Sequence, residues 1–363
     1  MTAAAAIFGC ALVLFVLWDA FETIILPRRV RRRFRLTRAF YRSTWQPWSL
    51  AARALKSRRR RETLLGLFGP LSLLLLLALW ALGLVIGFAV LQWAAGSALT
   101  GSMNSGIDAD FYFSGSTFFT LGLGDVFPRS HWARFLAVIE AGTGFGFLAM
   151  VISYLPVLYQ SFSRREVNIS LLDARAGTPP TALELLLRHQ DDMGEFTRLL
   201  QEWEQWSAEL LESHLSYPVL AYFRSQHDNQ SWLAALTAVL DVCALCMVGV
   251  RNGPARQARL TFAMARHALV DLAQVFNTPP SSIHLDRLPA NDLLRLRDLM
   301  HRFELNLRDD SDADRQLRHF REMYEPYAAA LSRFMLLDLP PWIRPQDSAD
   351  NWETSRWGRG TVV

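Results

Sequence analysis

Three stretches of the chain are apolar over a length that can cross a membrane. They run from about Thr2 to Leu26, from Leu64 to Trp93 and from Trp132 to Tyr159. A helix needs about 20 mostly apolar residues to span the hydrocarbon core of a bilayer, and each stretch is long enough. The first has no basic residue before it and a basic run after it, which indicates a retained anchor rather than a cleaved signal peptide. The pattern predicts three transmembrane helices.

The pattern changes after the third apolar stretch. From residue 163 onward, charged residues are frequent and apolar residues recur at spacings of three and four, whereas strand-like alternation is scarce. The sequence GTPP at 177–180 is typical of a turn at a domain boundary. We therefore expect a linker at 163–180, a helical domain at 181–340 and a C-terminal tail at 341–363.

The basic residues between the first two apolar stretches predict how the chain is oriented. Thirteen arginines and one lysine lie between Arg28 and Arg61, with no acidic residue among them. The positive-inside rule places this loop in the cytoplasm. Residues 1–27 then form a transmembrane helix with its N-terminus outside, and residues 28–62 form a basic cytoplasmic loop that contacts anionic lipid headgroups. The C-terminal domain is cytoplasmic.

The composition agrees with a membrane protein that carries a soluble domain. Of the 363 residues, 51% are hydrophobic and 20% are charged, and the mean hydropathy is +0.12. No aromatic platform accompanies the arginines, so the sequence does not indicate nucleic-acid binding. It also contains no catalytic cluster and no nucleotide-binding glycine motif, and Cys243 and Cys246 lie in an apolar stretch as buried small residues. We expect neither enzymatic activity nor a cofactor.

A short segment between the second and third apolar stretches is the most informative part of the chain. Residues 110–119 (DFYFSGSTFF) are too few to cross a bilayer and are suited to a re-entrant helix, whose C-terminal end favours a cation. Thr120–Asp125 (TLGLGD) follows directly, and this arrangement resembles the selectivity filter of potassium channels. Its glycines allow backbone angles that point successive carbonyls at one axis, where they replace the hydration oxygens of a cation. Each chain has one such loop, so four chains are needed for a ring.

These elements define the expected fold class. We predict an all-α membrane protein with three transmembrane helices, a re-entrant pore helix and filter, and a helical cytoplasmic bundle. The pore domain spans 63–162, with its pore loop at 110–126 and an outer and an inner helix on either side.

The stretch STFFTLGLGDVFP at 116–128 resembles the pore loop of the potassium-channel superfamily, and the resemblance extends from the outer helix to the end of the inner helix. It implies that backbone carbonyls of the first four filter residues hold K+, which is the permeant ion and not a cofactor. Gly144 stands where the family has its gating-hinge glycine, and Pro156 is a possible kink near an intracellular gate. The filter residues are Thr120, Leu121, Gly122, Leu123, Gly124 and Asp125.

Three positions depart from the commonest family pattern. Leu121 and Leu123 stand where valine and tyrosine, respectively, are usual. Leu123 cannot make the hydroxyl contact that the family's tyrosine makes with the pore helix. A GLGD ending does occur in the second pore of animal two-pore-domain potassium channels. Ser116 stands where some members carry a glutamate that pairs with the filter aspartate, which leaves Asp125 without that partner.

Three functional hypotheses follow. The resemblance favours a homotetrameric channel of the cell membrane that conducts K+ passively, with a cytoplasmic domain that assembles the tetramer or responds to an unidentified ligand or partner. The filter leucines keep open a nonselective or sodium-permeable cation channel. A nonconducting membrane sensor or scaffold built on a pore fold is the third hypothesis.

Overall fold

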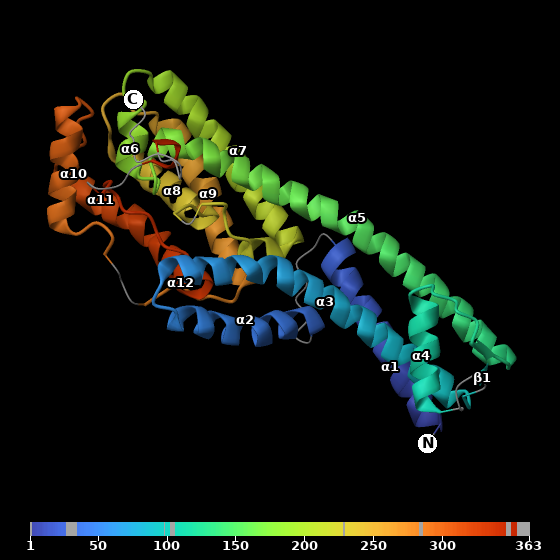
Figure 1. Cartoon of the computed structure of the whole chain (residues 1–363). Helices are drawn as coiled ribbons and strands as arrows, with labels where there is room; N and C mark the ends of the chain where they lie inside the picture. Colours follow the sequence, from blue (N-terminus) through green and yellow to red (C-terminus); the bar gives the residue numbers. More distant parts are fainter. Residues whose placement is uncertain are drawn as a thin grey trace. The chain divides into compact units, whose positions relative to one another are not determined.

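Helices form nearly all the regular structure, which confirms the predicted all-α class (Figure 1). The computed structural model describes residues 2–26, 35–97, 99–101, 106–227, 229–282, 286–345 and 350–353. The chain divides into two compact units. Unit 1 comprises Met1–Ala54 and Leu67–Gln160, and unit 2 comprises Leu55–Gly66 and Ser161–Val363.

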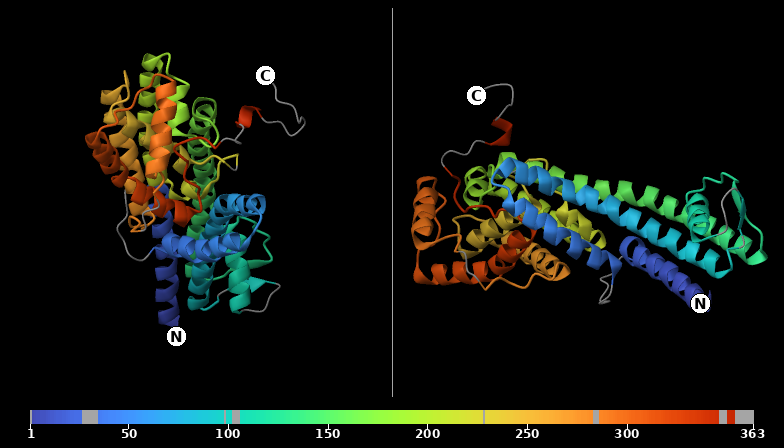
Figure 2. Two further views of the ribbon diagram at one scale, coloured as in Figure 1. Left: turned by 90° about the vertical axis from the view of Figure 1, so that its left-hand side faces the viewer. Right: turned by 60° about the horizontal axis from the view of Figure 1, so that its bottom comes forward.

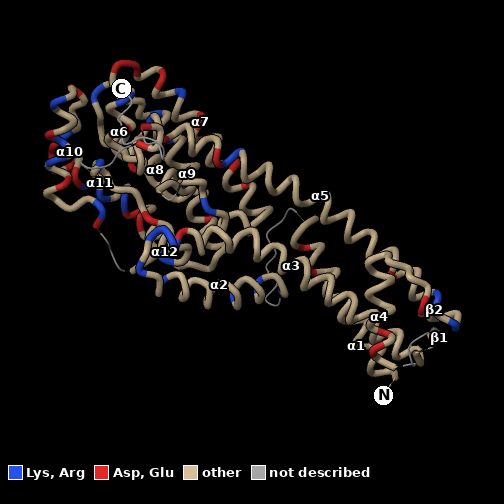
Figure 3. Tube along the Cα trace, in the orientation of Figure 1, with Lys and Arg blue, Asp and Glu red and all other residues tan. Residues whose placement is uncertain are grey.

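Among the residues that the structure describes, three helices are long and apolar enough to cross a membrane, as predicted. Helix α1 (Thr2–Ala20) continues into a π-helical turn at Phe21–Ile25, and the other two are α3 (Arg58–Ala94) and α5 (His131–Ala176). Figure 3 shows long uncharged stretches on α1 and α5, consistent with contact with lipid or with other apolar surfaces.

Helix α5 is longer than the sequence pattern indicated. It continues to Ala176 through most of the interval 163–180, which was expected to be a linker. The helix ends only where Gly177 adopts a φ of +75°, a left-handed conformation that commonly terminates helices. Pro156 lies inside this helix and does not end it. Helices α3 and α5 therefore each pass from unit 1 into unit 2 without a break in helical structure.

Residues 35–62 of the basic segment are largely helical and do not form the predicted loop. Helix α2 (Leu36–Ala54) occupies its centre, and α3 begins at Arg58. The helix is amphipathic, and its buried face includes Trp45 and Ala52. The Trp45 ring lies 4.8 Å from the ring of Phe68 on α3, and Tyr41 and Trp48 contact the same ring. Apolar periodicity within this arginine-rich segment explains why it folds as a helix.

Helix α1 packs closely against α3 within unit 1 (Figures 1 and 2). A Cβ atom on Gly9 would lie 2.9 Å from the carbonyl oxygen of Gly87, and a Cβ on Gly87 would lie 2.6 Å from a methyl group of Val13. Small residues at such positions let helices approach each other within a membrane. The apolar cluster beside this contact includes Trp80 and Phe118.

A buried polar contact fixes the end of α1. Asp19 accepts hydrogen bonds from the backbone amide and hydroxyl of Thr37, at 3.1 and 2.5 Å, and from the Trp80 indole at 3.1 Å. It thereby connects α1, α2 and α3. Glu22 lies 3.5 Å from the guanidinium of Arg35, so this carboxylate does pair with the arginine-rich segment.

Unit 2 is a helical bundle built around α8 (Trp232–Val248), in which every residue except Met247 is buried. Helices α7 (Met193–Ser216) and α9 (Ala255–Val275) pack against it. Cys243 and Cys246 lie on α8 as buried free thiols, as predicted, and burial raises the pKa of Cys246 to about 12. Shorter helices complete the unit: α6 (Ala182–Leu187), η2 (Pro218–Tyr222), α10 (Ala290–Arg302), α11 (Ser311–Glu322), α12 (Glu325–Met335) and η3 (Asn351–Glu353).

The last part of α5 is anchored in unit 2 by a buried arginine. Arg165 donates hydrogen bonds to the carbonyl oxygens of Leu220 and Phe223, each at 2.8 Å, and pairs with Glu166 at 2.9 Å. His214 contacts the same guanidinium, and burial together with this positive charge lowers the pKa of the histidine. The neutral imidazole avoids placing a second positive charge beside a buried one.

Candidate functional site

The pore helix predicted at 110–119 corresponds to α4 (Ile107–Phe118). Asp108 and Asp110 lie in its first turn, where negative charge is favourable to the helix dipole. Asp110 is buried and accepts a hydrogen bond of 2.6 Å from the Ser97 hydroxyl. At the other end, the amides of Thr120 and Leu121 donate to carbonyl oxygens in the last turn of α4 at 3.1 and 2.8 Å. The helix therefore passes directly into the predicted filter.

The backbone of the TLGLGD segment alternates in sign of φ. Thr120, Gly122 and Gly124 have φ angles of +57°, +58° and +76°, whereas Leu121 and Leu123 do not have positive φ. We expect this alternation to turn successive carbonyl groups to the same side of the segment. Glycine takes positive φ at little cost. A β-branched residue such as Thr120 rarely does, and strain of this kind is concentrated at functional sites.

The two filter leucines are unusually exposed in the single chain. Leu121 is 63% exposed and Leu123 is 65% exposed, and the neighbouring Phe119 is 59% exposed. Three large apolar side chains within five residues form a surface that is unfavourable in water. This segment therefore has the character of a surface that other protein or lipid covers.

Two contacts hold the outer end of the segment. Strand β2 (Val126–Pro128) begins directly after Asp125 and pairs antiparallel with β1 (Leu99–Gly101). The hydroxyl of Tyr112, on α4, donates a 2.8 Å hydrogen bond to Asp125. Asp125 thus has a partner on the pore helix, although Ser116 is not the residue that supplies it.

We expect Tyr112→Phe to loosen this end of the filter, because it removes the only hydroxyl that the described residues place on Asp125. The expected result is a reversal potential displaced toward zero in a gradient of potassium against sodium. Asp125→Asn should have a weaker effect because it keeps an oxygen acceptor. Asp108→Asn, which removes a charge from the exposed first turn of the same helix, is the control. Equal selectivity in wild type and Tyr112→Phe would contradict a role for this bond.

A second buried contact joins the three helices around the site. Ser114 on α4 donates to the carbonyl oxygen of Val85 on α3 at 2.8 Å and is also hydrogen-bonded to Glu140 on α5. Glu140 is fully buried. A polar group at membrane depth is costly unless it is paired, and the pairing here gives it a structural role in positioning α4. Gln92 on α3 donates to the carbonyl of Ala133 on α5 at 3.2 Å and adds a further connection.

Gly144 lies where α5 meets the end of α4. A Cβ atom on Gly144 would lie 2.0 Å from the carbonyl oxygen of Phe118, whereas Gly142 and Gly146 have nothing within 4 Å of the corresponding position. The residue is therefore required for close packing of the two backbones. Its role as a gating hinge stays a prediction, as does the role of Pro156.

The structure brings the predicted filter residues together with groups that the sequence analysis did not assign to the site. Tyr112 and Ser114 are two residues apart on α4, which also carries the hydroxyl-bearing residues Ser116 and Thr117. The sequence therefore does not distinguish the two hydroxyl groups that support the segment. Their partners, Asp125 and Glu140, lie 13 and 26 residues away, and only the fold identifies them.

A known protein family and a known protein are each similar to part of this chain. A family model described as "Ion channel" matches residues 74–160. The uncharacterized membrane protein YdjJ of Bacillus subtilis (strain 168) is 28% identical over 181 residues, which are 49% of this chain and 52% of that protein. The chain thus spans about half the length of this relative. No solved structure matches. By these similarities, residues 74–160 resemble an ion-channel domain, within a chain that resembles a membrane protein.

Proposed function

We propose that this protein is a homotetrameric potassium channel that conducts K+ passively through the TLGLGD segment. The observation that carries the proposal is the alternating backbone of Thr120, Gly122 and Gly124 at the end of α4. A strand whose carbonyls face one side supplies several oxygen ligands in sequence, and four such strands around an axis can replace the hydration shell of a cation.

The number of chains follows from the geometry of coordination. One chain contributes one filter strand, so a closed ring requires four copies. The C-terminal ends of four α4 helices would then point toward the axis, and their partial negative charge would favour a cation in the cavity below the filter. The exposed side chains of Leu121 and Leu123 would be covered by packing between copies.

The charge distribution supports the orientation that we propose in the cell membrane. The N-terminus lies outside, and α2 and unit 2 lie in the cytoplasm, because the arginine-rich segment 28–62 precedes the second membrane helix. Arg38 and Arg42 are exposed on α2, whose apolar face is buried against Phe68. Such a helix is suited to contact anionic headgroups at the cytoplasmic surface.

A nonselective or sodium-permeable cation channel is the second candidate. Leu121 and Leu123 carry no polar group that could tie the filter to the surrounding helices, and a filter that is held less rigidly discriminates less well between ions. The hydrogen bond from Tyr112 to Asp125 supports a potassium-selective channel. It ties the end of the proposed filter to α4, which the leucine side chains cannot do.

Reversal potentials in planar bilayers test the proposal. We expect purified full-length protein, with potassium on one side and sodium on the other, to reverse close to the potassium equilibrium potential. A reversal potential near zero would contradict potassium selectivity and favour the nonselective cation channel. Absence of current from protein whose tetrameric state has been verified by crosslinking would favour the nonconducting sensor or scaffold.

A further inference from the structure

Unit 2 contains an open pocket of about 600 Å³ beside α10. Its wall is formed by the start of α10, by Arg287 just before that helix, and by the segment 341–345. This segment was predicted to belong to a C-terminal tail, but Trp342 within it is only 1% exposed. Figure 3 shows charged residues of both signs on the neighbouring helices α10 and α11.

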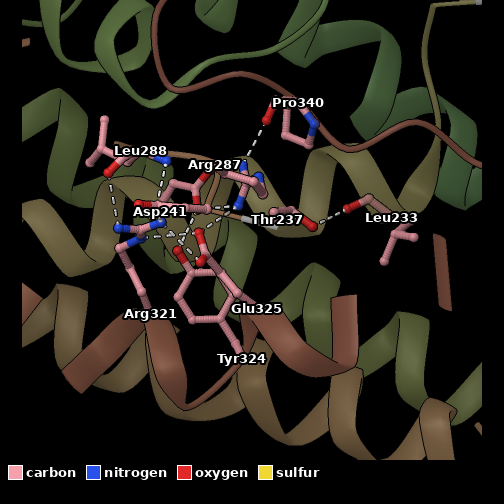
Figure 4. Close-up of polar contacts among 10 residues, drawn as sticks. Leu233, Thr237, Asp241, Arg287, Leu288, Arg321, Tyr324, Glu325 and Pro340 are labelled. Atoms are coloured by element: carbon pink, nitrogen blue, oxygen red, sulfur yellow. Dashed lines mark hydrogen bonds and ion pairs between the residues drawn. The ribbon is translucent and has the colours of Figure 1, made fainter. Parts of the chain in front are cut away.

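Arg287 is held rigidly in the pocket wall (Figure 4). Its guanidinium donates to both carboxylate oxygens of Asp241 at 3.1 and 2.5 Å, to Glu325 at 3.3 Å and to the carbonyl of Pro340 at 2.7 Å. Burial lowers the pKa of Arg287, but the two carboxylates outweigh this effect and raise it. The side chain is therefore charged at every physiological pH and has a single orientation.

Further contacts keep this network fixed. Tyr324 hydrogen-bonds Asp241, and Arg321 pairs with Glu325 at 3.1 Å (Figure 4). The guanidinium carbons of Arg287 and Arg321 lie 5.8 and 5.7 Å from the ring of Trp342. These distances are within the range of favourable cation–π contacts. Thus Arg287 and Trp342 in the pocket wall are held in place by a network that includes Arg321 behind them.

The pocket is lined by more basic than acidic residues, although the terminal nitrogens of Arg287 already donate hydrogen bonds within the wall. Arg287, Arg295 and Arg344 line the pocket, whereas Asp292 is its only acidic lining residue among those that the structure describes. Arg344 pairs with Asp350 at 3.1 Å. Arg295 is exposed and has no ion pair with any described residue.

We propose that this pocket binds a small phosphorylated metabolite. A guanidinium presents its donors in a planar fork that matches phosphate oxygens, and arginine is favoured wherever phosphate is recognised. The pocket volume lies within the range of small-molecule sites and exceeds what a bare ion occupies. The prolines and the isoleucine of 341–345 supply apolar wall for the rest of the molecule. This inference concerns unit 2 and does not depend on ion conduction.

Arg295→Gln is the informative variant. Because Arg295 is exposed and makes no ion pair with the described residues, its loss should leave folding intact. Arg287→Gln is unsuitable, since it would leave the buried carboxylate of Asp241 without its positively charged partner and destabilise the bundle. Arg302→Gln is the matched control: this arginine lies on the same helix, outside the pocket, in an exposed pair with Asp298.

Isothermal titration of the purified full-length protein tests the proposal with inorganic phosphate, AMP and glucose 6-phosphate, and with adenosine and glucose as unphosphorylated counterparts. We expect saturable binding of at least one phosphate compound, no binding of its counterpart, and at least about tenfold weaker binding by Arg295→Gln but not by Arg302→Gln. Absence of saturable binding by all three phosphate compounds would overturn the proposal. Equal binding of an unphosphorylated counterpart, or unchanged binding by Arg295→Gln, would also overturn it.

Discussion

Gly122→Ala and Gly124→Ala should each abolish potassium-selective current while the protein still assembles. Both glycines have positive φ, at +58° and +76°, and alanine in a left-handed conformation costs roughly 1–2 kcal/mol per residue. Each substitution would act in every chain of the proposed tetramer, so the cost accumulates to roughly 4–8 kcal/mol at a single ring of carbonyls. We expect the backbone to relax to negative φ, which turns the carbonyls away from the axis.

The steric environment shows that this effect is conformational. Neither glycine has an atom within 4 Å of a hypothetical Cβ, so within one chain the added methyl group meets nothing. The measurement is the reversal potential and single-channel current of each variant, with crosslinking to verify assembly. Gly142→Ala is the control because it adds a methyl group to open space on α5 at ordinary helical φ. Unchanged selective conduction in both filter variants would remove the pore assignment.

Gly144→Ala should destabilise the pore domain, whereas the same change at Gly142 or Gly146 should not. The new Cβ of residue 144 would lie 2.0 Å from the carbonyl oxygen of Phe118, a backbone atom that cannot rotate away. Overpacking of this kind costs about 1–3 kcal/mol, and the end of α4 must move to relieve it. Alanine at the other two positions gains roughly 1 kcal/mol from its higher helix propensity.

Thermal unfolding of the three variants in detergent, followed by current recording, distinguishes packing from gating. We expect a lower melting temperature and lost selectivity for Gly144→Ala, since Phe118 is two residues before the filter. If residue 144 served only as a hinge, the alanine variant would unfold like wild type and change open probability alone. Equal melting temperatures for Gly142→Ala and Gly144→Ala would contradict the packing role.

The sequence pattern located the elements that depend on local physics. Three apolar stretches of sufficient length became α1, α3 and α5, because the length of an apolar run directly reflects the medium that it occupies. The short segment before TLGLGD is also helical, as α4, but it is too short to span a membrane. The limits of these helices were less accurate, because charged residues such as Arg58 and Arg165 are compatible with helix and do not mark where a membrane ends.

The helix within 28–62 was missed for a different reason. Its arginines dominated the interpretation, although Trp45 and Ala52 follow the spacing of a buried helical face. Charge count predicts the side of the membrane, while periodicity predicts the secondary structure, and the two signals must be evaluated separately.

The sequence by itself determined the all-α class and the three long apolar helices, because each of these depends on residues close together in the chain. The orientation expected from the arginines and the filter role of the TLGLGD segment stay predictions. Tertiary structure alone decided which groups support that segment. Tyr112 reaches Asp125, Ser114 reaches Glu140, and Gly144 admits the Phe118 carbonyl. These contacts depend on how helices cross in space, and a single hydroxyl or glycine in a sequence does not reveal which distant residue it will meet.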